Sequence, residues 1–95
     1  MDRRGLVSAA ARRSGLSREQ MRDALDALLE TVVEALASGE TVAIASFGRF
    51  ETQVYPGRKL RRFGGPGHYA VEERQVPVFR SSAVLRRRVK GGKPS

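Results

Sequence analysis

The sequence predicts an α+β fold, with two N-terminal helices, a small antiparallel β-sheet and a short C-terminal helix. Three observations lead to this prediction. An apolar stripe with helical period runs over residues 21–36, short alternating segments follow it, and a basic, glycine-rich stretch at residues 54–74 interrupts those segments. The 95 residues show no internal repeat and suffice for one small domain, which we place at residues 1–90.

The two N-terminal helices have clear start and stop signals. A first helix is expected over residues 3–13, with Asp2 as its N-cap. Ser17 and Gln20 form a capping box at the start of the second helix, and Gly39 is expected to close that helix in the left-handed conformation. The apolar stripe of the second helix predicts a core face that is wide enough for part of it to pack on a second subunit.

Alternating apolar residues predict strands at residues 41–45, 50–54 and 75–79. Pro77 lies within the last of these segments, which indicates a sheet edge or a bulge there. Phe47 and Phe50 flank a Gly turn and are expected to anchor the core rather than to form a platform for base stacking.

A short, strongly basic helix is expected near the C-terminus. Ser81 or Ser82 can cap it, and Val84, Leu85 and Val89 would form its buried side. Residues 91–95 are expected to be a disordered basic tail.

The positive charge is concentrated in the second half of the chain. The net charge is +8, but residues 1–54 carry seven Lys and Arg against eight Asp and Glu, whereas residues 55–95 carry eleven against two. A local excess of this kind is typical of a surface that binds nucleic acid. Within residues 54–74, four basic residues are followed by one large apolar residue, Phe63, and then by the turn sequence Gly-Gly-Pro-Gly. A basic limb with an apolar tip fits a grooved, anionic partner.

Several other functions are disfavoured by composition. The chain has no cysteine, which excludes disulfides and thiolate zinc sites, and no apolar run approaches the ~18 residues of a membrane span. The N-terminal residues lack the apolar core of a secretion signal, so a cytoplasmic protein is expected. The one histidine, His68, is expected to lie in a turn, and the adjacent Glu72 and Glu73 would point to opposite faces of a strand. We therefore expect neither an enzyme nor a metal or other cofactor.

Two segments carry a resemblance to a known family. Residues 46–50, SFGRF, and residues 76–80, VPVFR, resemble motifs of the bacterial histone-like DNA-binding proteins, the HU and integration host factor family. The resemblance covers residues 2–90 and includes the order of the elements. It implies an intertwined dimer in which the helices form a base and two β-ribbon arms, at about residues 54–74, embrace double-stranded DNA through its minor groove. At each arm tip a wedge would enter a base step and kink the duplex.

The implied function is architectural. The protein would bend or compact DNA of the nucleoid with low sequence specificity, as a homodimer or a heterodimer, because no element resembles a sequence-reading helix. Arm residues would reach the groove or the phosphates, and a saddle between the arms would bind phosphates with side chains, the 46–48 backbone and the start of the last helix. The candidate DNA-binding residues are Arg3, Ser46, Gly48, Tyr55, Arg58, Lys59, Arg61, Arg62, Phe63, Arg74, Arg80, Ser81 and Arg86.

The arm departs from the family pattern. Tyr55 replaces a basic or polar residue, Leu60 replaces a small one, and Phe63 occupies the position of the family's wedge proline when the motifs are matched without gaps. Either Phe63 is the wedge or the tip is shifted and Pro66 takes that role. A third arrangement has Phe63 packed on Tyr69 across the ribbon.

Three further functions compete with this interpretation. Site-preferring DNA bending, as in integration host factor, is a variant of the same activity. An RNA-binding or ribosome-associated module would also be basic, although the shallow minor groove of A-form RNA offers little to a ribbon arm. A protein-only dimerisation module would have a basic surface with no effect on DNA shape.

Overall fold

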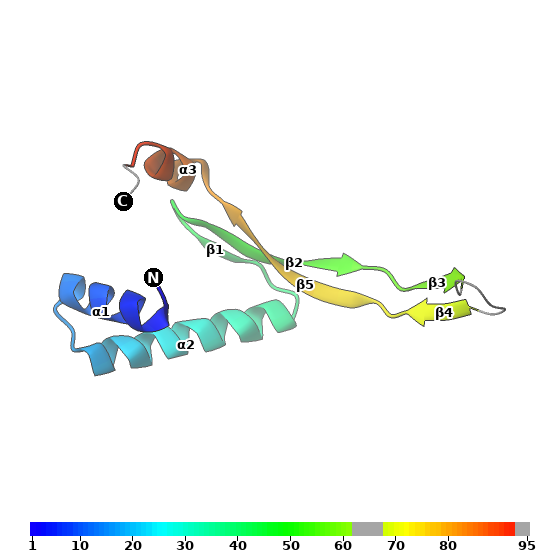
Figure 1. Ribbon diagram of the computed structural model, residues 1–95, viewed down its shortest axis with the longest axis horizontal. Coiled ribbons are helices and arrows are strands. Elements are labelled where there is room, and N and C mark those ends of the chain that lie inside the picture. The colour runs from blue at the N-terminus through cyan, green and yellow to red at the C-terminus, as the bar shows by residue number, and fades with distance from the viewer. Residues whose placement is uncertain (62–67, 93–95) are drawn as a thin grey trace. The chain divides into compact units, whose positions relative to one another are not determined.

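A computed structural model of the chain describes residues 1–61 and 68–92, and of residues 58–61 and 68–71 it describes the backbone alone. It forms two units, Met1–Ala35 and Leu36–Ser95. The described residues contain three helices and five strands in the predicted order, two helices followed by strands and then one helix (Figure 1). No helix of the described residues is long and apolar enough to cross a membrane. In chain order the elements are α1 (Arg3–Ser14), α2 (Arg18–Ala37), β1 (Val42–Ile44), β2 (Gly48–Tyr55), β3 (Arg58–Arg61), β4 (His68–Val71), β5 (Arg74–Ser81) and α3 (Ala83–Lys90).

The first unit contains α1 and most of α2, and both helices begin at the predicted caps. The Asp2 carboxylate accepts a hydrogen bond from the Gly5 N–H at 2.8 Å. The Ser17 hydroxyl accepts from the Gln20 N–H and the Gln20 side chain accepts from the Ser17 N–H, both at 3.0 Å, so the capping box is confirmed. Gly39 has φ +86°, which confirms the left-handed residue expected after α2.

The second unit is organised by a three-stranded antiparallel sheet in the order β1-β2-β5. β5 is an edge strand, and its register with β2 runs without a bulge through the pair Thr52–Pro77. The edge position explains how a proline is tolerated, because its missing N–H removes no hydrogen bond from the interior of the sheet.

The two faces of this sheet differ in character. Phe50 and Phe79 are opposite each other in the β2–β5 register, and the Phe79 ring lies 4.9 Å from the Phe50 ring and 5.4 Å from the Phe47 ring. This aromatic cluster matches the packing role expected of Phe47 and Phe50. The other face carries Arg49, Glu51 and their neighbours at alternate positions.

The described side chains form very little core. Of the residues whose side chains are described, the buried hydrophobic ones are Val7 and Ala11. Phe47 and Phe79 remain 43% exposed, and Leu28 and Val33 of α2 are 64% and 59% exposed. A chain that leaves its largest apolar side chains in water lacks the burial that normally stabilises a folded domain.

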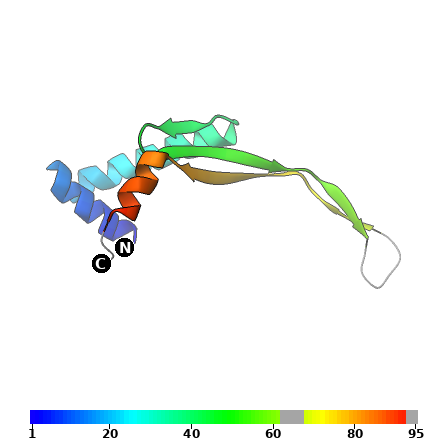
Figure 2. The same ribbon diagram turned by 90° about the horizontal axis from the view of Figure 1, so that it is seen from above.

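A two-stranded ribbon extends the sheet. β2 and β5 pair as far as Tyr55 and Arg74, and β3 and β4 then pair from Arg58 and Val71 onward (Figure 2). Two residues on each strand, at 56–57 and 72–73, separate the ladders, so the register continues without an inserted residue. His68 begins β4 opposite Arg61 rather than lying in a turn, and Glu72 and Glu73 fall between strands, which corrects both expectations. The positions of these three residues depend on the pairing of β3 with β4, which the local sequence does not reveal.

Candidate nucleic-acid interface

A cationic hollow of about 540 Å³ lies where β5 leads into α3. We call it the β5–α3 hollow. Three guanidinium groups and two serine hydroxyls contribute to its wall, a donor set that suits phosphate oxygens. It brings together the predicted site residues Arg80, Ser81 and Arg86. The lining residues are Arg49, Phe79, Arg80, Ser81, Ser82, Ala83 and Arg86.

The start of α3 is held in place by its own hydrogen bonds. Ser82 is the N-cap, and its hydroxyl accepts from the Leu85 N–H at 3.0 Å. Arg86 donates to the Ser81 carbonyl at 2.6 Å and lies 3.3 Å from the Ser81 hydroxyl. The Ala83 and Val84 N–H groups have no acceptor within the helix, as at any helix start, and favour an anion there.

The turn between β1 and β2 lies beside this helix start. The Ser82 N–H donates to the Phe47 carbonyl at 2.9 Å, which joins the predicted 46–48 backbone segment to the β5–α3 hollow. Ser46 adopts φ +64°, a left-handed conformation that is uncommon outside glycine. At Gly48, an added Cβ would lie 2.5 Å from the Arg80 carbonyl oxygen and 2.7 Å from the Phe79 ring. Glycine is therefore required for this close approach of β2 and β5.

One carboxylate lies between two arginines of this site. Glu51 accepts hydrogen bonds from Arg80 and from Arg49, the latter at 3.1 Å. These bonds, Arg80 first, together with the charges of both arginines, hold the pKa of Glu51 below its ordinary value of 4.5. Glu51 is therefore ionised at neutral pH and remains paired.

The structure describes some of the predicted arm residues with their side chains and others by their backbone alone. The guanidinium of Arg74 lies over the Tyr55 ring, with its central carbon 5.2 Å from the ring centroid, at the last pair of the β2–β5 ladder. Arg58, Lys59 and Arg61 belong to β3, where only the backbone is described. The predicted arm-tip contacts Arg62 and Phe63, and the alternative wedge Pro66, lie outside the described residues.

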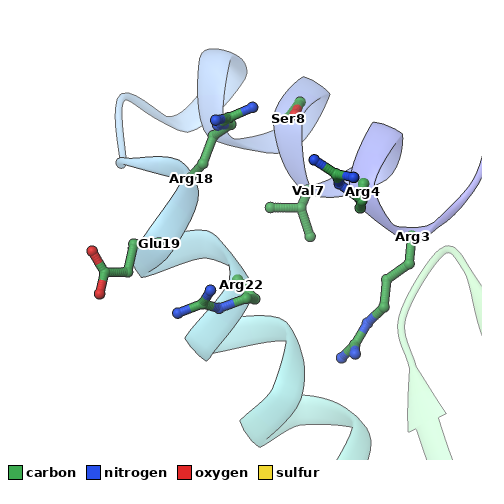
Figure 3. Close-up of a pocket in the computed structure, with 7 residues that line it drawn as sticks. All are labelled: Arg3, Arg4, Val7, Ser8, Arg18, Glu19 and Arg22. Carbon is green, nitrogen blue, oxygen red and sulfur yellow. The ribbon is translucent and has the colours of Figure 1, made fainter.

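Arg3 belongs to the other unit, where its guanidinium forms an ion pair with Asp26. It borders a second hollow, of about 600 Å³, between α1 and α2. In Figure 3, Arg4, Arg18 and Arg22 surround Val7, whereas Glu19 extends away from it. The lining of this helical hollow is strongly cationic, although residues 1–54 as a whole carry no excess of positive charge.

Sequence reasoning missed several of these residues. Neither Arg49 nor Glu51 is among the candidate DNA-binding residues predicted from the sequence. The strand alternation places both on one face of β2, but only the pairing with β5 brings Arg80 to them. Arg4, Arg18 and Arg22 are spread over two helices, so their proximity also depends on packing. No group of His, Cys, Asp or Glu suited to a metal ion occurs in the described part of the chain.

Comparison with known proteins identifies the family. The family model described as "Bacterial DNA-binding protein" matches residues 1–90. DNA-binding protein HU of Thermotoga maritima is 34% identical over 90 residues, which are 95% of this chain and 100% of that protein. Integration host factor subunit alpha of a Methylobacterium species is 38% identical over 91 residues, covering 95% and 86% of the two chains.

Solved structures agree with the sequence relatives. The chain in an Anabaena HU–DNA cocrystal structure aligns with a TM-score of 0.81 at 29% identity, covering 97% of this chain and 100% of that one. Thermotoga maritima HU aligns with a TM-score of 0.67 at 29% identity, covering 94% and 98%. Because sequence motifs, element order and fold all agree over nearly the whole length, the chain belongs to the bacterial DNA-binding protein family of HU and the integration host factor subunits.

Proposed function

We propose that this protein is an architectural DNA-binding protein of the nucleoid, which binds double-stranded DNA with low sequence specificity and bends or compacts it. The observation that carries the proposal is the β5–α3 hollow, where Arg49, Arg80 and Arg86 gather beside a helix start, at the end of the β2–β5 ladder opposite to the β3–β4 ribbon. A relative of the same fold was crystallised with DNA, which supports the assignment.

The ribbon provides the second part of the mechanism. Residues 55–95 carry a net charge of +9, and the ribbon presents part of it on two strands in one continuous register. Such a ribbon can lie along the minor groove while the hollow binds the phosphate backbone. Phosphate contacts orient a protein without reading sequence, which accounts for the low specificity.

The active form in this proposal is a dimer, with a homodimer as the simplest arrangement. One subunit supplies one ribbon, and its apolar side chains on α2 and on the aromatic cluster of the sheet are left exposed. A second subunit would bury these residues and supply the other ribbon. The DNA would then lie between two arms.

The wedge at the arm tip is assigned to Phe63. Phenylalanine is one of the side chains that enter base steps in minor-groove complexes. We expect Phe63→Ala to reduce DNA bending, measured by energy transfer between duplex ends, more than it reduces affinity. Arg61→Ala should instead weaken binding and change the residual bend little. If Phe63→Ala bends DNA like wild type and Pro66→Ala does not, Pro66 is the wedge.

A competition assay tests the proposal as a whole. Linear duplex DNA, nicked or kinked DNA and duplex RNA compete at fixed salt, and we expect the deformable DNA to compete best and RNA to compete least. The logarithm of the affinity should fall with the logarithm of salt concentration, with a slope of about 0.9 for each phosphate neutralised. Preference for RNA, or an affinity that is independent of salt, would contradict the proposal.

Site-preferring bending is the second candidate, and the 38% identity to an integration host factor subunit favours it. It is distinguished by selecting bound sequences from a random duplex pool. Enrichment of one common motif would support site preference. Enrichment of flexible or A·T-rich steps alone supports low specificity.

A further inference from the structure

Two arginines of the β5–α3 hollow are placed against each other by the sheet. Arg49 and Arg80 are direct partners in the β2–β5 register, so their side chains leave the same face of the sheet. Like charges in this arrangement repel each other, and long arginine side chains would ordinarily spread apart in solvent. Something must hold them together if both are to line one hollow.

Glu51 supplies that restraint. It lies two residues from Arg49 on the same face of β2, and its two carboxylate oxygens are divided between the arginines: Oε2 accepts from Arg49 Nε at 3.1 Å, and Oε1 accepts from Arg80 Nε. Both bonds use the Nε of the guanidinium. The terminal nitrogens, which carry the remaining N–H donors, are left for another acceptor.

The hollow presents the arginines and not the acid. Arg49 and Arg80 both line it, whereas Glu51 is absent from its lining and only 25% of its side chain is exposed. An anion that enters the hollow therefore meets Arg49 and Arg80, whereas Glu51 does not line the hollow. This arrangement differs from a masked site, in which the acid would occupy the position of the ligand.

We propose that Glu51 is a positioning residue that holds Arg49 and Arg80 as a two-arginine clamp for a single DNA phosphate. The inference rests on the proposed function and adds Arg49 as a DNA contact. Its physical basis is preorganisation: two long side chains are ordered before binding, so less conformational freedom is lost when the phosphate arrives. The proposal requires this gain to exceed the cost of one extra negative charge near the site.

The test is the DNA affinity of Glu51→Gln, measured with a fluorescent duplex at several salt concentrations. Its control is Glu40→Gln, in the exposed segment between α2 and β1, which changes the net charge equally. We expect Glu51→Gln to bind about three- to tenfold more weakly, about the range for ordering one long side chain. Its salt slope should be shallower by about 0.9, the value for one lost phosphate contact. Glu40→Gln should bind as tightly as wild type or more tightly.

A double-mutant cycle separates positioning from a general structural effect. In the Arg49→Gln/Arg80→Gln background the clamp is absent, so Glu51→Gln should cause no further loss of affinity. Glu51→Asp keeps the charge but is too short to reach both arginines, and it should also bind more weakly than wild type. This variant serves as the test if Glu51→Gln fails to fold.

The outcomes are distinct. Binding of Glu51→Gln that equals or exceeds wild type overturns the clamp and indicates that Glu51 opposes DNA binding by its charge. A loss of the same size in the double-arginine background also overturns it. If wild type itself does not bind DNA, the proposed function fails rather than the role of Glu51.

Discussion

Two residues of β2, Gly48 and Glu51, have specific roles in the packing and the electrostatics of the second unit. Gly48 lets β2 approach β5 and makes room for the Phe79 ring. The Glu51 carboxylate accepts hydrogen bonds from Arg49 of β2 and from Arg80 of β5, which are opposite each other in the β2–β5 register. Both residues lie within four positions of each other on β2. One short segment of this strand therefore packs closely against β5 and also contacts two arginines of the cationic hollow.

Replacement of Gly48 by alanine should destabilise the protein by about 1–3 kcal/mol, the usual range for overpacking. The added Cβ would meet the Arg80 carbonyl oxygen at 2.5 Å, and a backbone atom cannot move aside as a flexible side chain can. Urea unfolding at fixed protein concentration measures the change. Gly91→Ala is the control, since its Cβ would meet its nearest neighbour at 3.4 Å. Equal stability of the two variants would contradict the prediction.

The lowered pKa of Glu51 predicts a pH dependence of stability. A carboxyl group whose pKa is lower in the folded state stabilises that state above its ordinary pKa of 4.5, and the contribution is lost as the pH falls through the lowered value. Glu51→Gln should therefore melt at a lower temperature than wild type at neutral pH, and the difference should shrink as the pH falls below 4.5 and through the lowered pKa. A difference that stays constant over this range, measured by circular dichroism, would argue against the pairing with Arg80 and Arg49.

Elements in this chain begin and end where side chains satisfy the free backbone groups. The capping box starts α2, Ser82 starts α3, and Gly15 and Gly39 follow the ends of α1 and α2 with positive φ. The ribbon follows another rule, because its length depends on pairing between residues far apart in sequence. The ribbon is interrupted at residues 56–57 and 72–73, but the register stays the same on both sides of the interruption. The pairing of β3 with β4 therefore continues the pairing of β2 with β5.

The cap of α2 can be tested directly. Ser17→Ala removes the hydroxyl that accepts from the Gln20 N–H, and it should lower the free energy of unfolding by about 1 kcal/mol. Ser17→Asp supplies another acceptor at the same position and should restore most of this loss. Chemical unfolding of the three proteins measures both effects. Failure of aspartate to restore stability would show that the hydroxyl acts otherwise than as a cap.

At the scale of the whole molecule, one chain leaves apolar residues of α2 and of the aromatic cluster exposed. In the proposed dimer a partner surface would bury these residues, and the second chain would supply a second arm. Stability and DNA binding would then be linked, because subunits that separate would lose the buried surface and the paired arms together.

Leu29→Gln should therefore weaken association of the subunits. Leu29 is 46% exposed in one chain, and in the proposed dimer we expect this exposed part to be buried against the partner. Loss of about half the burial of a leucine, about 0.75–1.5 kcal/mol, should raise the dissociation constant by about three- to tenfold. Sedimentation over a range of concentrations measures it, with Glu30→Gln on the polar side of α2 as the control. Unchanged association of both variants would place the interface elsewhere.

The local features of this protein were determined by the sequence alone. The sequence predicts the roles of Asp2, the Ser17–Gln20 capping box and Gly39, because a helix end depends on groups within about four residues. Alternation predicts β1, β2 and β5, and the SFGRF and VPVFR segments at their separation indicate the family. The identity of the wedge, Phe63 or Pro66, stays a prediction.

Contacts between distant segments were decided only by the tertiary structure. Arg49, Glu51 and Arg80 become one group because the β2–β5 register puts residues 29 positions apart on one face. The β3–β4 pairing places His68 in β4 rather than in the expected turn, and the two ladders together show where the ribbon is interrupted. Charge composition could locate the basic half of the chain, but the direction in which each arginine points depends on the partner strand. For that physical reason the clamp is a property of the fold and not of any segment.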